Sequence, residues 1–361
     1  MIPDRAAVRR RLRAWFARHA RGLPWRHDRD PYRVWISEVM LQQTQVVTVI
    51  PYFHRFLERF PTVDSLAAGP LHDVLRLWEG LGYYRRARDL HRAARLLVER
   101  HGGAIPSDSE AVRALPGFGR YTANAVLSQA YELRLPILEA NSVRVLCRLF
   151  AIEDDPKSPA VQKRLWQLAE DLLPTKRIGD FNQALMELGA LVCTPQSPKC
   201  VACPLAGECQ ARQRGLVETI PRKGTAAKIE AVREVAVVVR RRGEVLLVQR
   251  PAEGRWGEMW EFPRVALAGD QTHDEAAAIL MTTLGLDVEL GREIVTIRHG
   301  VTRFRITLVC LEAMHRSGRL RPGIYPAGVW MSPEKLADYP VSRPQRQLAE
   351  AVLRGPSAKL F

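Results

Sequence analysis

The sequence has no uninterrupted apolar run long enough to cross a bilayer, and its start lacks the continuous hydrophobic core of a secretory signal. It also shows no repeat period and no low-complexity tract. We therefore expect no membrane association and place the chain in a reducing cytosol, associated with the nucleoid. The basic, amphipathic residues 5–16 are compatible with an organelle address, but an ordinary first helix is the favoured explanation.

Acidic residues are scarce relative to basic ones. Asp and Glu total 39 against 54 Lys and Arg, which gives a net charge of +15. A surplus of this size attracts polyanions, either nucleic acid or an anionic membrane surface. The 361 residues, 47% of them hydrophobic, are enough for two domains with cores of ordinary size.

Cysteine is also sparse, and two of the six cysteines have a simple explanation. Cys147 falls on an apolar helical face and Cys310 on an apolar strand face, so both are expected in the core. The other four lie close together, with the spacing Cys193-x6-Cys200-x2-Cys203-x5-Cys209.

Four thiolates so closely spaced can close a tetrahedral zinc site or carry an iron–sulfur cluster, and the residues alone do not choose between the two. The segment 193–209 contains no His and leaves no ligand position open, which indicates a structural role. Two local disulfides are the alternative, and a reducing compartment disfavours them.

The pattern of apolar residues changes once along the chain. Residues 1–212 show helical spacing punctuated by Pro and Gly, including one long stretch over 34–59. Residues 213–232 are polar, basic and aperiodic, and they read as a linker that either lies on DNA or is simply solvated. Residues 233–361 are rich in alternating β-branched positions, with a hairpin at 241–243 and a helix over 274–284. An all-α domain is therefore expected to precede a smaller α+β domain.

Two glycines, Gly117 and Gly119, lie in Leu115-Pro-Gly-Phe-Gly-Arg-Tyr-Thr-Ala between two helical patterns. A tight turn there would point backbone amides outward at the start of the second helix, and such amides bind a phosphate without any side chain. Such a turn between helices often has no ligand. In a strongly basic chain, it resembles a helix–hairpin–helix motif.

Three motifs resemble the endonuclease III superfamily of DNA glycosylases: the hairpin, the cysteine spacing and Gly80-Leu-Gly-Tyr-Tyr-Arg-Arg-Ala. The segment Pro31-Tyr-Arg-Val-Trp-Ile-Ser-Glu-Val-Met-Leu-Gln-Gln-Thr-Gln-Val is similar to the adenine DNA glycosylase (MutY) family within it. In the second domain, Trp256-Gly-Glu-Met-Trp-Glu-Phe-Pro is similar to the start of that family's C-terminal Nudix-like domain.

The resemblance implies an all-α helix–hairpin–helix glycosylase domain with an iron–sulfur loop, followed by an α+β Nudix-like domain. It favours a [4Fe–4S] cluster over zinc at Cys193, Cys200, Cys203 and Cys209. It also implies a monomer that excises adenine from double-stranded DNA containing A:8-oxoguanine or A:G mispairs, as a step of base excision repair.

Glycosidic bond cleavage needs a proton for the leaving base and an anion near the sugar cation. Glu38 lies in an apolar stretch, where desolvation raises the pKa of a carboxyl and suits it to act as a general acid. The alternative is a buried Glu that caps a neighbouring loop. By resemblance, the second carboxylate is Glu139, where the family pattern Asp-Gly-Asn is replaced by Glu-Ala-Asn. We expect Glu to cap the following helix poorly and to need a local backbone shift, with Asn141 helping to hold the site.

Tyr121 replaces the Schiff-base Lys that bifunctional relatives carry in this hairpin, which predicts a monofunctional glycosylase. The remaining roles rest on the resemblance. Glu187 and Arg26 would contact the flipped adenine and Trp25 would line its pocket, whereas Gln43 and Tyr83 would enter the helix beside the opposite base. For Trp25 and Tyr83, core packing is the alternative.

The second domain lacks the acidic helix of a working Nudix hydrolase, since Ala278, Ile279, Thr282 and Thr283 stand where charged residues would hold metal. We therefore expect no diphosphate hydrolysis, and the resemblance implies that the domain binds 8-oxoguanine instead. The recognition loop, usually Phe-Ser-His, reads Val-Thr302-Arg303, and a surface hairpin without ligand is the alternative. For the whole chain, the alternatives are a glycosylase for thymine or oxidised pyrimidines and a lesion-binding protein without turnover.

Overall fold

The structure is a computed structural model that describes residues 3–222, 224, 228–321 and 323–354. The predicted linker is described only in part, because residues 223 and 225–227 lie outside the described residues. The chain divides into two compact units, one formed by Met1–Ala68 with Asp89–Thr225 and the other by Gly69–Arg88 with Ala226–Phe361. In the described part, no helix is both long and apolar enough to span a membrane. The predicted domain boundaries at 212 and 233 stay a prediction.

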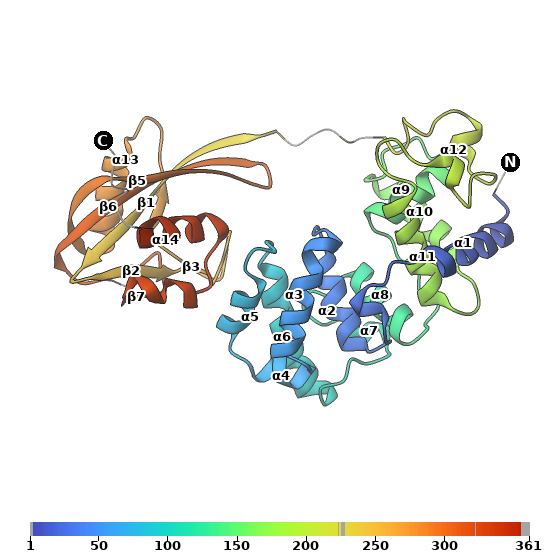
Figure 1. Cartoon of the computed structure of the whole chain (residues 1–361), viewed down its shortest axis with the longest axis horizontal. Helices are drawn as coiled ribbons and strands as arrows, with labels where there is room; N and C mark the ends of the chain where they lie inside the picture. Colours follow the sequence, from blue (N-terminus) through green and yellow to red (C-terminus); the bar gives the residue numbers. More distant parts are fainter. Residues whose placement is uncertain (1–2, 223, 225–227, 322, 355–361) are drawn as a thin grey trace. The chain divides into compact units, whose positions relative to one another are not determined.

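The described residues of the first unit are helical, as expected from their apolar spacing (Figure 1). The prediction of one uninterrupted pattern over 34–59 is wrong, because the chain breaks between Leu41 and Val46, where Gln43 adopts a left-handed φ of 57°. The helices of the N-terminal 225 residues are α1 (Arg5–His19), α2 (Pro31–Leu41), α3 (Val46–Arg59), α4 (Val63–Ala68), α5 (Leu71–Trp78), α6 (Arg85–His101), α7 (Ser109–Arg113), α8 (Arg120–Ala130), α9 (Ala140–Leu149), α10 (Pro159–Leu172), α11 (Ile178–Leu191) and α12 (Gln210–Gln213).

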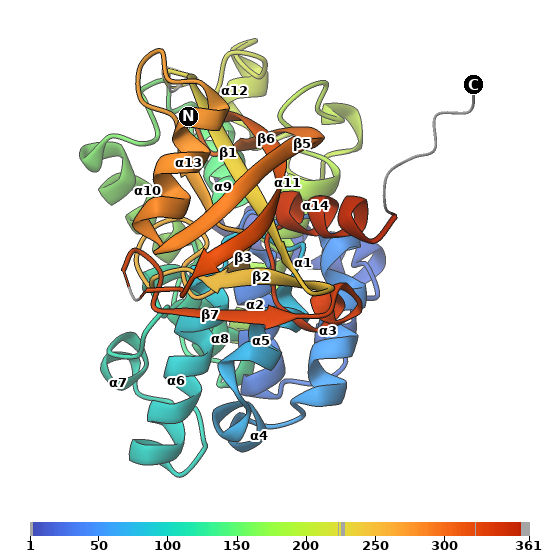
Figure 2. The same ribbon diagram turned by 90° about the vertical axis from the view of Figure 1, so that its left-hand side faces the viewer.

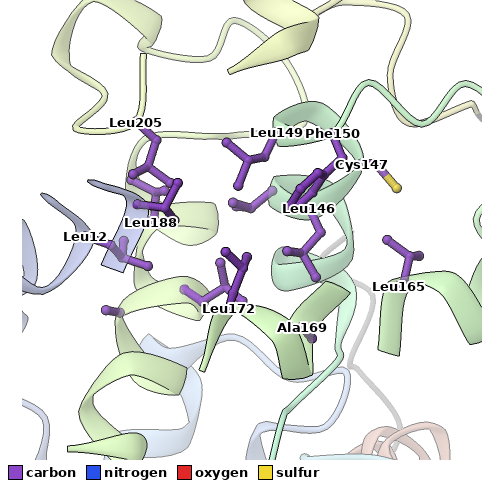
Figure 3. Packing of buried hydrophobic residues seen from close by; sticks show 14 of the residues in the cluster. Leu12, Leu146, Cys147, Leu149, Phe150, Leu165, Ala169, Leu172, Leu188 and Leu205 are labelled. Carbon is purple, nitrogen blue, oxygen red and sulfur yellow. The ribbon is translucent and has the colours of Figure 1, made fainter. Parts of the chain in front are cut away.

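One core of this unit joins helices that are far apart in sequence. Leu12 of α1, Leu146 of α9, Leu172 of α10 and Leu188 of α11 converge in it (Figure 3). Cys147 is fully buried in the same cluster, which confirms it as a core residue. Burying these leucines fixes α9, whose N-cap is Glu139, and α11, which carries Glu187.

The described residues of the second unit form a seven-stranded mixed sheet of order β3-β2-β1-β6-β5, with β4 pairing β1 and β7 pairing β2. Strand β1 pairs parallel with β6 and antiparallel with β2, and the expected hairpin at 241–243 is confirmed by the register Arg241↔Glu244. The elements are β1 (Glu230–Arg241), β2 (Glu244–Gln249), β3 (Trp260–Glu261), β4 (Arg264–Ala266), α13 (His273–Thr283), β5 (Leu286–Val301), β6 (Phe304–Gly318), β7 (Ala327–Met331) and α14 (Arg343–Arg354).

Strand β1 shows why the sheet is covered on both faces. Val235, Val237 and Val239 pack with α13, whereas the alternate residues Ala236 and Val238 pack with α14. Figure 2 shows α13 and α14 beside the strands. Cys310 is buried in the α14-side cluster, as its strand position predicted. A helical unit followed by an α+β unit is therefore confirmed as the architecture.

Candidate active site

A pocket of about 750 Å³ opens in the first unit, between α2, α8, α9 and α11. Most of the site residues expected from the sequence line it, although they are separated by more than 160 positions along the chain. Those residues are Trp25, Arg26, Glu38, Gln43, Gly117, Gly119, Tyr121, Glu139, Asn141 and Glu187.

Glu38 lies on α2 at the wall of this pocket and is only 4% exposed. Its carboxyl accepts a hydrogen bond of 2.6 Å from the Tyr121 hydroxyl and one of 2.8 Å from Nε2 of Gln129. Burial raises the pKa of Glu38, and the negative charge of Glu139 adds to this rise, against the opposing effect of the two hydrogen bonds. The carboxyl is thus held in place and keeps its proton to a higher pH than an exposed Glu.

The hairpin before α8 brings Tyr121 to Glu38. Gly117 has a φ of 77°, and a Cβ there would lie 3.0 Å from Cβ of Asp89, so this turn requires glycine. Gly119 is the N-cap of α8, with an ordinary extended backbone. Because α8 begins at the next residue, Tyr121 falls in its first turn, and its hydroxyl reaches Glu38 and Sδ of Met186.

The expectation that Glu139 caps poorly is wrong. Its side chain folds back over α9 and accepts hydrogen bonds from the backbone N–H of Asn141 at 2.8 Å and of Ser142 at 2.7 Å. The Ser142 hydroxyl in turn accepts from the Glu139 N–H, which completes a capping box. The extended backbone of Glu139, with φ −138°, gives the longer side chain the room to turn back. Burial nevertheless raises the pKa of Glu139, although these hydrogen bonds act in the opposite direction.

Asn141 connects this carboxylate to the cysteine segment. Its Nδ2 donates to Glu139, and its Oδ1 accepts from Nη2 of Arg144 at 2.7 Å. Nε of Arg144 donates to the backbone oxygen of Cys193, also at 2.7 Å. Helix α11 passes so close that a Cβ on Gly189 would lie 2.6 Å from Cβ of Asn141. The Glu139 carboxylate is therefore fixed by the same network that fixes the start of the cysteine segment.

Glu187, on α11, is also buried, but its carboxylate is already paired. It accepts from the backbone and side-chain Nε and Nη2 of Arg21, at 2.7–3.0 Å, and from Nη2 of Arg26 at 3.1 Å. Burial alone would raise the pKa of Glu187, but these arginines outweigh it and lower the pKa to about 2. The group is therefore an anion that holds Arg21 and Arg26 at the pocket wall.

Two site residues were not found from the sequence. Gln129, a buried partner of Glu38, lies on α8, and Arg21, the main partner of Glu187, lies in the loop after α1. The only sequence signal for Gln129 was a polar residue in an apolar helical stretch. Trp25 is 5% exposed and packs edge-on against Phe53 at 5.4 Å, so it both fills the core and lines the pocket.

The four clustered cysteines line a second, smaller cavity, together with apolar Val192, Pro198, Ala206 and Val217. Among the described residues, no three His, Cys, Asp or Glu side chains meet closely enough to share one metal ion. Nη1 of Arg148 donates to Sγ of Cys193 at 3.3 Å and to the oxygen of Thr194 at 2.7 Å. Four thiols around a hollow, beside a guanidinium, fit a polynuclear cluster with a net negative charge.

The other predicted residues belong to the second unit. Tyr83 is 49% exposed, with a left-handed φ of 48°, so it is not a core residue. Thr302 and Arg303 form the two-residue turn between Val301 and Phe304, at the tip of the β5–β6 hairpin. Both are exposed, and Arg303 lies 3.5 Å from the Glu230 carboxylate and against the Phe304 ring.

Three family models match the chain. Residues 36–171 match the HhH-GPD superfamily base excision DNA repair protein, residues 193–209 the iron–sulfur binding domain of endonuclease III, and residues 234–351 the NUDIX domain. These matches confirm the helix–hairpin–helix, iron–sulfur and Nudix-like assignments made from the sequence. The cofactor is accordingly a [4Fe–4S] cluster, and the cysteine-lined cavity lies within the matched segment.

Curated relatives match over most of the chain. The adenine DNA glycosylase of Rattus norvegicus is 36% identical over 96% of this chain and 78% of its own length. That of Buchnera aphidicola subsp. Baizongia pistaciae is 38% identical over 69% of this chain and 70% of its own length. Among solved structures, a thermostable thymine-DNA glycosylase is 29% identical, with a TM-score of 0.53 over 58% of this chain and 97% of its own.

If the four clustered cysteines hold the iron–sulfur cluster, replacing one of them should remove iron, whereas replacing a core cysteine should not. Cys203→Ser removes a thiol from the cavity and should lose most of the bound iron and the visible absorbance of the purified protein. Cys310→Ala, in the core of the second unit, is the matched control and should keep both. Equal iron content in the two variants, or zinc in place of iron in the unaltered protein, would contradict the assignment.

Proposed function

Because the chain belongs to the adenine DNA glycosylase family, we propose that it excises adenine paired with 8-oxoguanine and, more slowly, adenine paired with guanine. As a member of that family, it hydrolyses an N-glycosidic bond in base excision repair. The proposal concerns which mispair it prefers and which residues act. The observation that carries it is the buried Glu38 carboxyl, which lines the same pocket of the first unit as Glu139.

Glu38 is proposed as the general acid. The adenine must leave the base stack to reach a buried group, and it then needs a proton before it can depart. Tyr121 and Gln129 both donate to the Glu38 carboxyl and hold it at the wall of the pocket, where a flipped adenine would meet it. Once it has given up this proton, Glu38 is able to take one from the attacking water.

Glu139 is proposed to stabilise the positive charge that develops on the sugar when the base departs. Its capping hydrogen bonds and Asn141 hold its oxygens at the pocket wall, and Arg144 holds Asn141. The carboxylate is thus positioned before the substrate binds, and no rearrangement is needed when the charge appears.

A Schiff base needs a primary amine, and the hairpin position where bifunctional relatives carry Lys holds Tyr121. The hydroxyl of Tyr121 donates to Glu38 instead. The enzyme is therefore proposed to be monofunctional. The backbone amides after Gly117 and Gly119 would hold a DNA phosphate, and Gln43 and Tyr83 would enter the duplex beside the base opposite adenine. Trp25 and Arg26 would contact the flipped adenine, with Glu187 keeping Arg26 in place.

The second unit is proposed to bind 8-oxoguanine without pyrophosphatase activity. On its helix α13 the Thr282 and Thr283 hydroxyls bond back to the helix backbone, at positions where metal-binding carboxylates would stand. Thr302 and Arg303, exposed at the hairpin tip, would contact the lesion or its flanking phosphates. We further propose that Cys193, Cys200, Cys203 and Cys209 are the cluster ligands and that the protein acts as a monomer in the bacterial nucleoid.

One assay tests the proposed substrate. The protein is incubated with duplexes carrying A opposite 8-oxoguanine, A opposite G or T opposite G, and the strands are then cleaved with alkali. We expect the fastest abasic-site formation for A opposite 8-oxoguanine and none for T opposite G. Borohydride should trap little covalent enzyme–DNA adduct, in line with monofunctional chemistry.

Two other functions would give different results in this assay. Release of thymine would indicate a related glycosylase with another base preference, and the 29% identity to a thymine-DNA glycosylase makes that control necessary. Tight binding to the mispair without any abasic product would indicate a lesion-binding protein.

The pH dependence should follow the two raised carboxyl pKa values. Glu38 acts while protonated, so the single-turnover rate should fall as pH rises through its raised pKa. Glu139 acts while ionised, so the rate should also fall as pH decreases through the pKa of that group. Glu38→Gln should be slower by about a hundredfold or more, without the alkaline decline. A decline at high pH that is unchanged in Glu38→Gln would assign the proton to another group.

The role of Glu139 separates into a charge and a helix cap. Glu139→Ser keeps a good N-cap but removes the carboxylate, so it should lose about a hundredfold in single-turnover rate with little change in melting temperature. Glu139→Ala should lose the rate and also about 1 kcal/mol of stability. Glu139→Asp should retain more rate than either. Unchanged rates in all three variants would remove Glu139 from the mechanism.

A further inference from the structure

The segment Gly69–Arg88 precedes most of the first unit in sequence but packs as part of the second unit. One of its attachments is the Glu79 carboxylate, which accepts from Nε of Arg346 at 2.7 Å and from Nη2 at 2.8 Å. Such a two-bond pair fixes both the distance and the orientation of its partners. The hydrogen bond to Glu79 raises the pKa of Arg346, although burial alone would lower it.

Arg346 is itself firmly held. Its Nη1 donates to the oxygen of Leu336 at 2.7 Å and its Nη2 to that of Tyr339 at 2.8 Å. These oxygens lie in and just after the 3₁₀ helix Pro333–Asp338, whose final carbonyls have no partner within the helix. The Arg346 guanidinium therefore joins Glu79 to the end of this helix. Hydrogen bonds hold both charged side chains in place.

Two more side chains of the segment bind carbonyls of the same 3₁₀ helix. Nη1 of Arg76 donates to the oxygen of Ala337 at 2.8 Å, and Nε2 of His72 lies 2.9 Å from the oxygen of Asp338. At the other end of the segment, Nη1 of Arg88 donates to the oxygen of Ala252 at 2.9 Å. The segment is thus attached to the second unit on both sides of the loop 79–84.

The loop 79–84 carries Tyr83 and is internally braced. Nε1 of Trp78 donates to the oxygen of Gly82, and Nη2 of Arg86 donates to the same oxygen, both at 3.2 Å. The Arg86 guanidinium also lies over the rings of Trp78 and Tyr83, at 5.4 and 5.6 Å. Gly82, with φ 71°, permits the tight path of the backbone. Tyr83 is therefore presented by a stiff loop, whose position depends on where its ends are anchored.

We propose that the Glu79–Arg346 ion pair is a positioning pair, through which the second unit sets where Tyr83 enters the DNA beside the base opposite adenine. This inference rests on the proposed function, because it takes Tyr83 as the inserting residue and the second unit as the reader of 8-oxoguanine. Its new content is that lesion reading and Tyr83 insertion occur on one packed body. When the hairpin tip contacts 8-oxoguanine, the second unit takes up a position on the DNA, and the same position inserts Tyr83.

The test measures the preference for 8-oxoguanine, as the ratio of single-turnover rates for A opposite 8-oxoguanine and A opposite G. Arg346→Met keeps an apolar stem and removes the charge, and Glu79→Gln removes the other partner. We expect each variant to lower this ratio about fivefold, mainly because the rate on the 8-oxoguanine duplex falls. The ratio of the double variant should be no lower than that of Arg346→Met alone. A 2-aminopurine next to the lesion should report reduced unstacking in the same variants.

Arg240→Met is the matched control, because Arg240 pairs with Glu312 inside the same sheet, at similar burial, and is separate from segment 69–88. It should keep the unaltered ratio, and melting temperatures verify that all variants are folded. Unchanged ratios in Arg346→Met and Glu79→Gln, additive losses in the double variant, or an equal loss in Arg240→Met would each overturn the inference. An unaltered protein without preference for 8-oxoguanine would instead overturn the proposed function.

Discussion

A single buried carboxyl group, that of Glu38, sets the main constraint on the first unit. A carboxyl away from water must be surrounded by donors that orient it without removing its ability to hold a proton. Tyr121 and Gln129 supply these donors from one helix, α8, which therefore has to pack directly against α2. The glycine turn before α8 makes this possible, because it starts the helix where Tyr121 can reach Glu38. The turn proposed to bind a DNA phosphate thus also positions Tyr121 against the proposed general acid, Glu38.

The second carboxylate depends on a different kind of support. Glu139 is held by the first turn of α9, and Asn141 and Arg144 extend this support to the backbone of Cys193. The cluster segment and the pocket lined by Glu38 and Glu139 therefore share one hydrogen-bonded path through α9. A longer side chain than the Asp of the family pattern is accommodated because it folds back over the helix end as a cap. Its carboxylate lines the pocket of the first unit.

Much of this could be predicted from short segments of sequence. Helical and strand periods depend on neighbouring residues, and the predicted hairpin at 241–243 and helix over 274–284 lie within a residue of where the structure has them. The cysteine spacing and the glycine hairpin are also local, so their chemistry was visible in the sequence. The break between α2 and α3 was not visible in the sequence, because it depends on a single residue, Gln43, that adopts a left-handed backbone within a continuous apolar pattern. Arg21 was missed because its partner, Glu187, is distant in sequence.

The sequence alone determined the order of an all-α and an α+β domain and the four-cysteine segment, because these follow from local periods and motif spacing. The choice of an iron–sulfur cluster over zinc came from the resemblance to the glycosylase family. Only the tertiary structure decided how the charged groups pair. It placed Gln129 on Glu38, paired Glu187 with two arginines, and joined Glu79 to Arg346 across more than half the chain. Such pairs depend on which surfaces meet after the apolar faces are buried, and no local pattern in the sequence records that choice.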